Sequence, residues 1–272
     1  MKALVFLTAL SLLSGAPSVA QGTPPTPTAA PQTAQQATGR DFFLFSKALK
    51  NLRQGQVSSQ ITMDVQGEGL AVVVRGQIVL IHKASGEYSS EVTVQPPLGG
   101  AIKRYRILSN GKTTWVVDLG ANTYALQPVT DDNEFLVRGL LVGLAKTALA
   151  KLEPAQLKLL DTPEPTPELA TELEAAVKKD DGSLKVRDET LEGKVYRVYD
   201  LQPGKEKGVI SIYVNPAGRP ERLSMVLDQD KLKIKFSEII KSSLSIVPEG
   251  TKFQFTPTKT MQKVKKIDIG NF

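Results

Sequence analysis

Hydrophobic positions along the chain follow two different periods. Over residues 41–53 the apolar residues Phe42, Phe45, Leu49 and Leu52 recur at spacings of three and four, which predicts a helix with one apolar face. Runs of alternating apolar and polar residues follow and predict strands. These strands are expected over residues 58–65, 71–83, 88–95, 103–108, 113–119 and 122–127. Short turns separate them, with Asn110-Gly111 as the strongest hairpin signal, so we expect an antiparallel meander.

A helical insertion is predicted after this meander. Residues 131–152 contain no proline, and between Glu134 and Lys151 only Arg138, Lys146 and Thr147 are polar. This composition predicts a single helix that is buried on more than one side. A second helix is expected to begin at Thr166-Pro167-Glu168 and to run to about Lys179.

Strand patterns return in the last third of the chain. They are expected over residues 195–201, 208–214, 221–227, 231–236, 244–247 and 252–255. The elements together predict an α+β fold: a single curved antiparallel sheet of about ten to twelve strands, forming a half-barrel. The N-terminal helix and the helical insertion are expected to cover its concave face. Neither group of strands has enough helix to cover itself, so we predict one domain over residues 41–272.

The N-terminal region has a different composition. Residues 1–20 read as a signal peptide, with Lys2, an apolar stretch over residues 3–13, and the segment Ser18-Val19-Ala20, which has small residues at the two positions that a signal peptidase reads. Residues 21–40 are almost entirely Pro, Thr, Gln and Ala, which predicts a disordered tether. The mature chain, beginning near Gln21, is therefore expected to be exported to the periplasm without a transmembrane segment.

Composition excludes several classes of active site. The chain has no cysteine and a single histidine, His82, so thiolate metal sites, multi-histidine metal sites and cysteine nucleophiles are ruled out. The paired aspartates lie at turns or helix ends, where aspartate is common in any protein. We expect no enzyme activity, no metal and no cofactor. The net charge of +6 comes from scattered basic residues without interleaved aromatic residues, which argues against nucleic acid as a partner.

Three segments carry a resemblance to a known family. Segment 107–118 (ILSNGKTTWVVD) has a hairpin turn followed by a strand with Trp and Asp, segment 215–223 (NPAGRPERL) has a turn followed by Gly, Pro and basic residues, and segment 247–257 (VPEGTKFQFTP) has Phe-x-Phe before proline. Together with the order of elements over residues 41–264, they resemble the periplasmic lipoprotein-carrier family with the LolA/LolB-like fold. The chain departs from that pattern in its long helical insertion and in Pro257-Thr258-Lys259 after the last strand.

The resemblance implies a binding protein whose apolar half-barrel holds a lipid or a lipoprotein acyl chain as a carrier in the cell envelope. Envelope proteins would deliver or receive that cargo. The alternative is an envelope sensor or structural protein that uses the same fold to bind a protein partner. The same apolar residues would also form an ordinary core, and the sequence does not separate these roles. The predicted cavity lining is Val72, Val74, Ile78, Leu80, Tyr105, Ile107, Trp115, Val117, Ile210, Ile212, Leu223, Met225, Leu232, Ile234 and Phe236, and the predicted lid residues are Phe135, Leu136, Leu140, Leu141 and Leu144.

Overall fold

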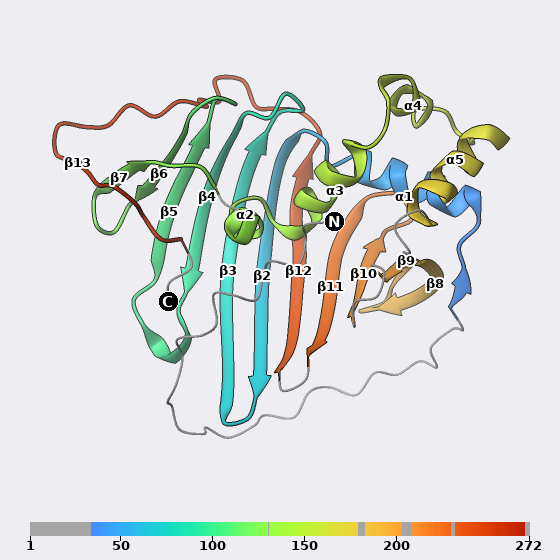
Figure 1. Ribbon diagram of the computed structural model, residues 1–272, viewed down its shortest axis with the longest axis horizontal. Helices are drawn as coiled ribbons and strands as arrows, with labels where there is room; N and C mark the ends of the chain where they lie inside the picture. Colours follow the sequence, from blue (N-terminus) through green and yellow to red (C-terminus); the bar gives the residue numbers. More distant parts are fainter. Residues whose placement is uncertain (1–33, 130, 179–182, 203–207, 230–231, 270–272) are drawn as a thin grey trace.

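The computed structural model describes residues 34–129, 131–178, 183–202, 208–229 and 232–269 (Figure 1). One curved sheet contains 13 strands in the order β1-β8-β9-β10-β11-β12-β2-β3-β4-β5-β6-β7-β13. Its neighbours pair antiparallel except for β13, which lies parallel to β7. The α+β half-barrel is therefore confirmed. The sheet has more strands than the ten to twelve expected, and it is mixed rather than purely antiparallel.

The strands are β1 (Gln35–Gln36), β2 (Gly55–Gly67), β3 (Leu70–His82), β4 (Tyr88–Gln95), β5 (Lys103–Ser109), β6 (Thr114–Asp118), β7 (Thr123–Leu126), β8 (Ser183–Leu191), β9 (Lys194–Gln202), β10 (Gly208–Val214), β11 (Pro220–Gln229), β12 (Leu232–Leu244) and β13 (Gln262–Lys263). The helices are α1 (Gly39–Lys50), α2 (Asp131–Arg138), α3 (Leu140–Leu149), α4 (Pro154–Leu159) and α5 (Pro167–Lys178), with a short 3-10 helix, η2 (Pro97–Gly99). None of the helices in these residues is long and apolar enough to cross a membrane.

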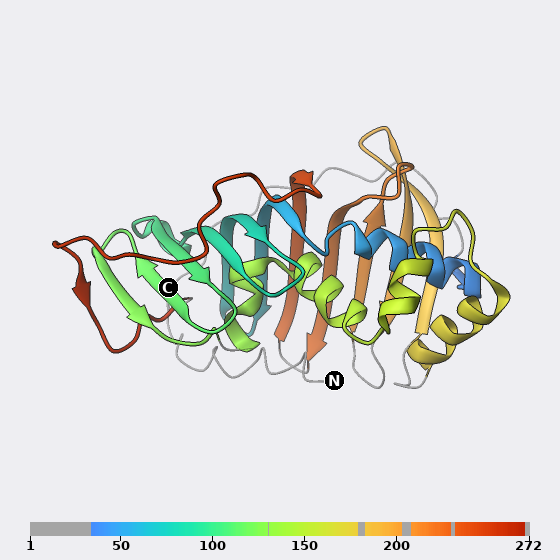
Figure 2. The same ribbon diagram turned by 90° about the horizontal axis from the view of Figure 1, so that it is seen from above.

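Helices α1, α2 and α3 lie on one side of the sheet, its concave face (Figure 2). Helix α1 buries Phe42, Phe43, Phe45 and Leu49 against it, and the ring of Phe45 lies 5.1 Å from the ring of Tyr199 in β9. The core is therefore a layer of apolar side chains between the concave face and the helices, as expected for a sheet with one apolar face.

The folded part begins earlier than residue 41. Strand β1 pairs with Val186 and Lys185 of β8, and helix α1 starts at Gly39 with Thr38 as its N-cap. Thr38 and Asp41 cap each other reciprocally, which satisfies two free amides at the helix start. The predicted boundary of the tether at residue 40 is therefore wrong. The signal peptide and the tether up to residue 33 lie outside the described residues.

The helical insertion also differs from the prediction. Residues 131–152 do not form one helix, because the chain breaks at Gly139, whose φ is +78°. Two helices, α2 and α3, result. The second predicted helix is present as α5, and the short helix α4 was not anticipated.

The C-terminal part contains two wrong strand predictions and one omission. Strand β8 was not predicted, because its Arg187-Asp188-Glu189 run weakens the apolar alternation. Residues 245–260 form no strand and instead run along the end of the sheet at which β12 finishes (Figure 1), where the ring of Phe255 lies 5.7 Å from that of Tyr124 in β7. After β13, Ile267 and Ile269 return to the main core.

Candidate functional site: the concave face and its helical lid

Strand register sets which side chains share the concave face, because directly paired residues of antiparallel strands point to the same side. One row runs across five strands through the pairs Ile210 with Met225, Met225 with Phe236, Phe236 with Met63, and Met63 with Val74. Every member of this row is apolar. The concave face therefore carries an unbroken apolar band from β10 to β3.

Thirteen of the predicted lining residues lie on this face, and two do not. Trp115 pairs with Leu108, and Val117 is paired with Arg106, whereas Ile107 is paired with Val116. Trp115 and Val117 therefore point to the convex face, and their prediction as lining residues is wrong. The physical reason is the period of two: the neighbour Val116, fully buried, is the residue that faces inward. The thirteen residues on the concave face are Val72, Val74, Ile78, Leu80, Tyr105, Ile107, Ile210, Ile212, Leu223, Met225, Leu232, Ile234 and Phe236.

Helices α2 and α3 form a lid over the middle of this face, and we use "lid" for these two helices. Leu136 and Leu141 are buried, at 5% and 0% exposure, and Phe135, Leu140 and Leu144 are partly buried against the core. All five predicted lid residues therefore lie on the lid helices. The lid occupies the space that a ligand on this face would require.

Two sheet side chains hold the lid at its break. Ser90 of β4 donates a hydrogen bond from its Oγ to the carbonyl oxygen of Val137 at 2.5 Å, and Glu238 of β12 accepts one from the amide of Leu141 at 2.9 Å. A helix break frees backbone groups that must find partners when they are buried. Here the sheet supplies one acceptor and one donor to them.

Gly139 is required at this break for two reasons. Its φ of +78° is a conformation that residues with a side chain rarely adopt, and a Cβ atom there would lie 2.2 Å from Oε1 of Glu238. The absence of a side chain lets the carboxyl group of Glu238 reach the first amides of α3. Sequence reasoning missed Glu238 and Ser90. Two features of the sequence could have pointed to Glu238: it is a carboxylate at an inward position of β12, and a glycine interrupts the apolar helical run.

Glu238 lies in an unusual environment for a carboxyl group. Its side chain is 0% exposed, and burial raises its pKa to about 7, although hydrogen bonds from Leu141, Ser59 and Leu140 act in the opposite direction. Desolvation penalises the charged form of a carboxyl group, which explains the direction of this pKa change.

A second polar group lies under α2. The guanidinium of Arg138, the last residue of α2, lies 3.9 Å from the ring centroid of Tyr88, and its Nε lies 3.1 Å from Oε1 of Glu134. Burial, and secondly the charge of Arg138, lower the pKa of His82 to about 4. His82 is therefore neutral at physiological pH, and its Nε2 has no hydrogen-bond partner among the described residues.

A separate group of concave-face residues lies beyond the lid, which we call the outer apolar cluster. Figure 1 shows the lid crossing the long strands partway along their length, while β2, β3, β11 and β12 continue toward the β2–β3 turn. Met63, Met225 and Leu232 are only partly buried in this cluster. The outer apolar cluster consists of Met63, Val65, Met225, Leu227, Leu232 and Ile234.

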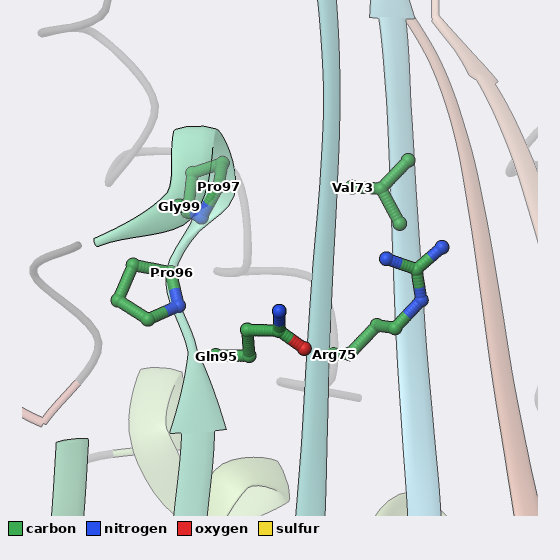
Figure 3. A pocket seen from close by; sticks show the side chains of 6 residues that line it. All are labelled: Val73, Arg75, Gln95, Pro96, Pro97 and Gly99. Atoms are coloured by element: carbon green, nitrogen blue, oxygen red, sulfur yellow. The ribbon is translucent and has the colours of Figure 1, made fainter. Parts of the chain in front are cut away.

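Two pockets lie away from the concave face. One, of about 140 Å³, is lined by Val73 and Arg75 of β3, by Gln95 and by the turn after β4 (Figure 3). The other, of about 90 Å³, lies at the rim of the sheet between Leu52, Arg219 and Leu244. Both are smaller than the roughly 300 Å³ at which pockets begin to enclose a small molecule. The concave face is the stronger candidate because a displaced lid would expose a much longer apolar surface.

Comparisons with known proteins give similarity of structure only. No protein-family model matches the chain, and no curated protein matches it. LprF from Mycobacterium bovis is similar with a TM-score of 0.37 and 12% identity, over 78% of this chain and 97% of that chain. MucB is similar with a TM-score of 0.36 and 13% identity over 79% of this chain, which spans 62% of the MucB chain. A LolA superfamily protein from Nitrosomonas europaea is similar with a TM-score of 0.29 and 11% identity, over 72% of this chain and 89% of that chain.

The curved sheet with helices on its concave face is the LolA-like architecture that the sequence resemblance implies. Among the residues described here, no group of three or more His, Asp or Glu side chains could hold a metal ion.

Proposed function

We propose that this protein binds an amphiphile with an acyl chain, such as a lipid or a lipoprotein, and carries it through the cell envelope. The observation that carries the proposal is the unbroken apolar band across β10, β11, β12, β2 and β3, covered by a lid whose two helices are separated by a break at Gly139. An acyl chain gains about 0.8 kcal/mol for each CH₂ group that it buries on such a surface. The signal-like residues 1–20 support export to the periplasm, and the role proposed is binding rather than catalysis.

The outer apolar cluster offers the entry point. Met63 and Met225 are partly exposed there, and methionine adapts its shape to irregular apolar ligands. From this cluster the apolar row continues beneath Phe135, which contacts Phe236 at the border of the lid. An acyl chain that advances along the row must replace lid contacts, so the affinity is what remains after those contacts are lost.

The test uses two adjacent residues that point to opposite faces. Met225→Asp places a carboxylate on the concave face, whereas Val226→Asp places one on the convex face, where Val226 is 38% exposed. We expect Met225→Asp to abolish uptake of a fluorescent fatty acid and Val226→Asp to leave it unchanged, because a buried carboxylate without a partner is costly. Leu232→Asp, at the less buried end of the outer apolar cluster, repeats the test if Met225→Asp fails to fold.

Native mass spectrometry of the purified mature protein separates the carrier from the partner-binding alternative. Co-purified lipid, lost in Met225→Asp, would support the carrier. If the protein is empty and all three aspartate variants bind the fatty acid as the parent does, the apolar band is ordinary core and the proposal is wrong. Binding of an envelope protein by such an empty form would then favour the sensor or structural role.

A further inference from the structure

Glu238 combines three features that an ordinary core residue does not need. Its carboxyl group is fully buried, it contacts the first amides of α3, and it occupies the space left by the missing side chain of Gly139. At an inward-facing position of β12 such as this one, an apolar residue would be the ordinary choice. The acid is therefore placed at the one point where the lid changes direction.

The groups around this carboxyl group are neutral. On the lid side they are the amides of Leu140 and Leu141, and on β2 the hydroxyl of Ser59, which is 1% exposed. Its cross-strand partners are the apolar residues Ile61 of β2 and Leu223 of β11. In the described part of the chain no Lys, Arg or His side chain pairs with Glu238.

The nearby charges of the lid are engaged elsewhere. Arg138, which precedes the break at Gly139, lies over Tyr88 and pairs with Glu134, and Lys146 of α3 also pairs with Glu134. The charge that acts on the pKa of His82 is that of Arg138 and not that of Glu238. A buried carboxylate would therefore be compensated only by helix amides and a hydroxyl.

We propose that Glu238 is the positioning residue of the lid and that lid opening is coupled to its ionisation: the lid is closed over the neutral acid and opens when the carboxylate forms and is hydrated. In the closed state Oε2 of Glu238 accepts the Leu141 amide, whereas Oε1, which lies against Gly139, has no hydrogen-bond partner among the described residues. On opening, the proton leaves to water and the lid amides lose their acceptor. This inference concerns the lid on which the proposed function depends, but it applies to the protein without ligand.

The direction of the pH dependence follows from the environment. Burial raises the pKa of Glu238 to about 7 in the closed state, and a hydrated carboxyl group in the open state returns toward its ordinary value of 4.5. Between these two pKa values the equilibrium constant for lid opening rises up to tenfold for each pH unit, so its full increase is roughly 300-fold. Below that range and above it, Glu238 contributes no further pH dependence.

Hydrogen exchange of the full-length protein tests this coupling directly. The exchange rates of the α3 amides would be measured between pH 5 and 8 in the parent and in Glu238→Gln, and corrected for the intrinsic exchange rate at each pH. Glu91→Gln is the control, because Glu91 lies on the exposed side of β4. We expect the opening of the parent relative to Glu238→Gln to rise roughly tenfold per pH unit up to about pH 7 and then to level off. Glu91→Gln should follow the parent. Comparing variants at each pH removes the contribution of His82, whose pKa is about 4 in the closed state and rises toward 6.5 if opening exposes the ring.

Parallel pH profiles for the parent and Glu238→Gln would overturn the inference. If Glu238→Gln does not fold, ¹³C NMR of the Glu238 carboxyl group in the parent gives the same decision. A carboxyl midpoint that coincides with the pH at which exchange of the α3 amides in the parent levels off supports the coupling, and a midpoint near 4.5 contradicts it. Neither measurement uses lipid, so a coupled lid in a protein that takes up no fatty acid would refute the proposed function and leave this inference standing.

Discussion

The ring of Phe135 in α2 meets the ring of Phe236 in β12 edge-on, with centroids 5.9 Å apart and planes inclined by 77°. Phe236 belongs to the main core, and its neighbours along β12 and β11, Ile234 and Leu227, belong to the outer apolar cluster. The aromatic pair therefore marks the border between the lid and the outer apolar cluster. A ligand moving inward from the outer apolar cluster meets Phe135 first.

Phe135→Ala is expected to lower the stability of the ligand-free protein and to raise its affinity for fatty acid. The contact that a ligand must displace is removed in advance, and an aromatic pair is worth about 0.5–1.5 kcal/mol beyond its buried area. Thermal unfolding and titration with a fluorescent fatty acid measure the two effects. Tyr213→Ala is the control, because Tyr213 makes an edge-on pair with Tyr196 on the convex face. Equal affinities for the parent and Phe135→Ala would show that the lid is not displaced by the ligand.

Ser90→Ala tests the second anchor of the lid. It removes the hydrogen bond to the Val137 carbonyl and leaves that buried oxygen without this donor, which is expected to cost about 1–3 kcal/mol. Urea unfolding measures this change, and hydrogen exchange in α2 should increase along with it. Ser89→Ala, the next residue toward the opposite face, is expected to change stability by less than about 0.5 kcal/mol. A Ser90→Ala variant as stable as the parent would mean that water replaces the hydroxyl.

Two buried groups give the protein opposing pH dependences. The pKa of His82 is lowered to about 4 in the folded state, so its contribution to stability is lost as pH falls from 6.5 toward 4. The pKa of Glu238 is raised to about 7, so its contribution is lost as pH rises from 4.5 toward 7. Each group changes the free energy of unfolding by about 3 kcal/mol over its range, and the two changes have opposite signs between pH 4.5 and 6.5.

Single variants should separate these two contributions. The unfolding free energy of Glu238→Gln relative to the parent is expected to increase with pH between 4.5 and 7, because the parent alone loses the stabilisation from the protonated acid. His82→Asn relative to the parent should show the reverse trend between pH 4 and 6.5. Denaturant unfolding at half-unit pH steps measures both. Two flat difference curves would show that neither group is held in its buried, neutral form.

Sequence reasoning was most successful where one period governs a long run. The alternation over residues 71–83 and 221–236 placed the concave-face residues of β3, β11 and β12 correctly. It failed at Trp115 and Val117, because on β6 both faces are apolar: Val116 faces the core, and Val117 is covered on the convex side. Short two-sided strands carry no alternation from which to choose a face.

The lid break could not be predicted from local patterns for a different reason. Residues 131–152 have the composition of one helix, and Gly139 alone costs a helix only about 1 kcal/mol. What fixes the break is the sheet, through Ser90 and Glu238, which lie 47 and 97 residues away from their partners in the chain. Tertiary contacts at such separations are invisible to periodicity. The same holds for β1, whose Gln35-Gln36 sequence has no strand character of its own.

At each end of the sheet a two-residue strand pairs with its neighbour, β1 with β8 and β13 with β7. An open strand edge is a template on which other chains can add, and therefore a route to aggregation. Strand β1 and Ala37 cover only Leu184 to Val186 of β8; the strand continues with Arg187, Asp188 and Glu189, whose charges discourage further pairing. Proteolytic trimming as far as Ala37 would thus remove more than a terminal peptide. It would turn a protein with protected edges into one that can polymerise through its own sheet.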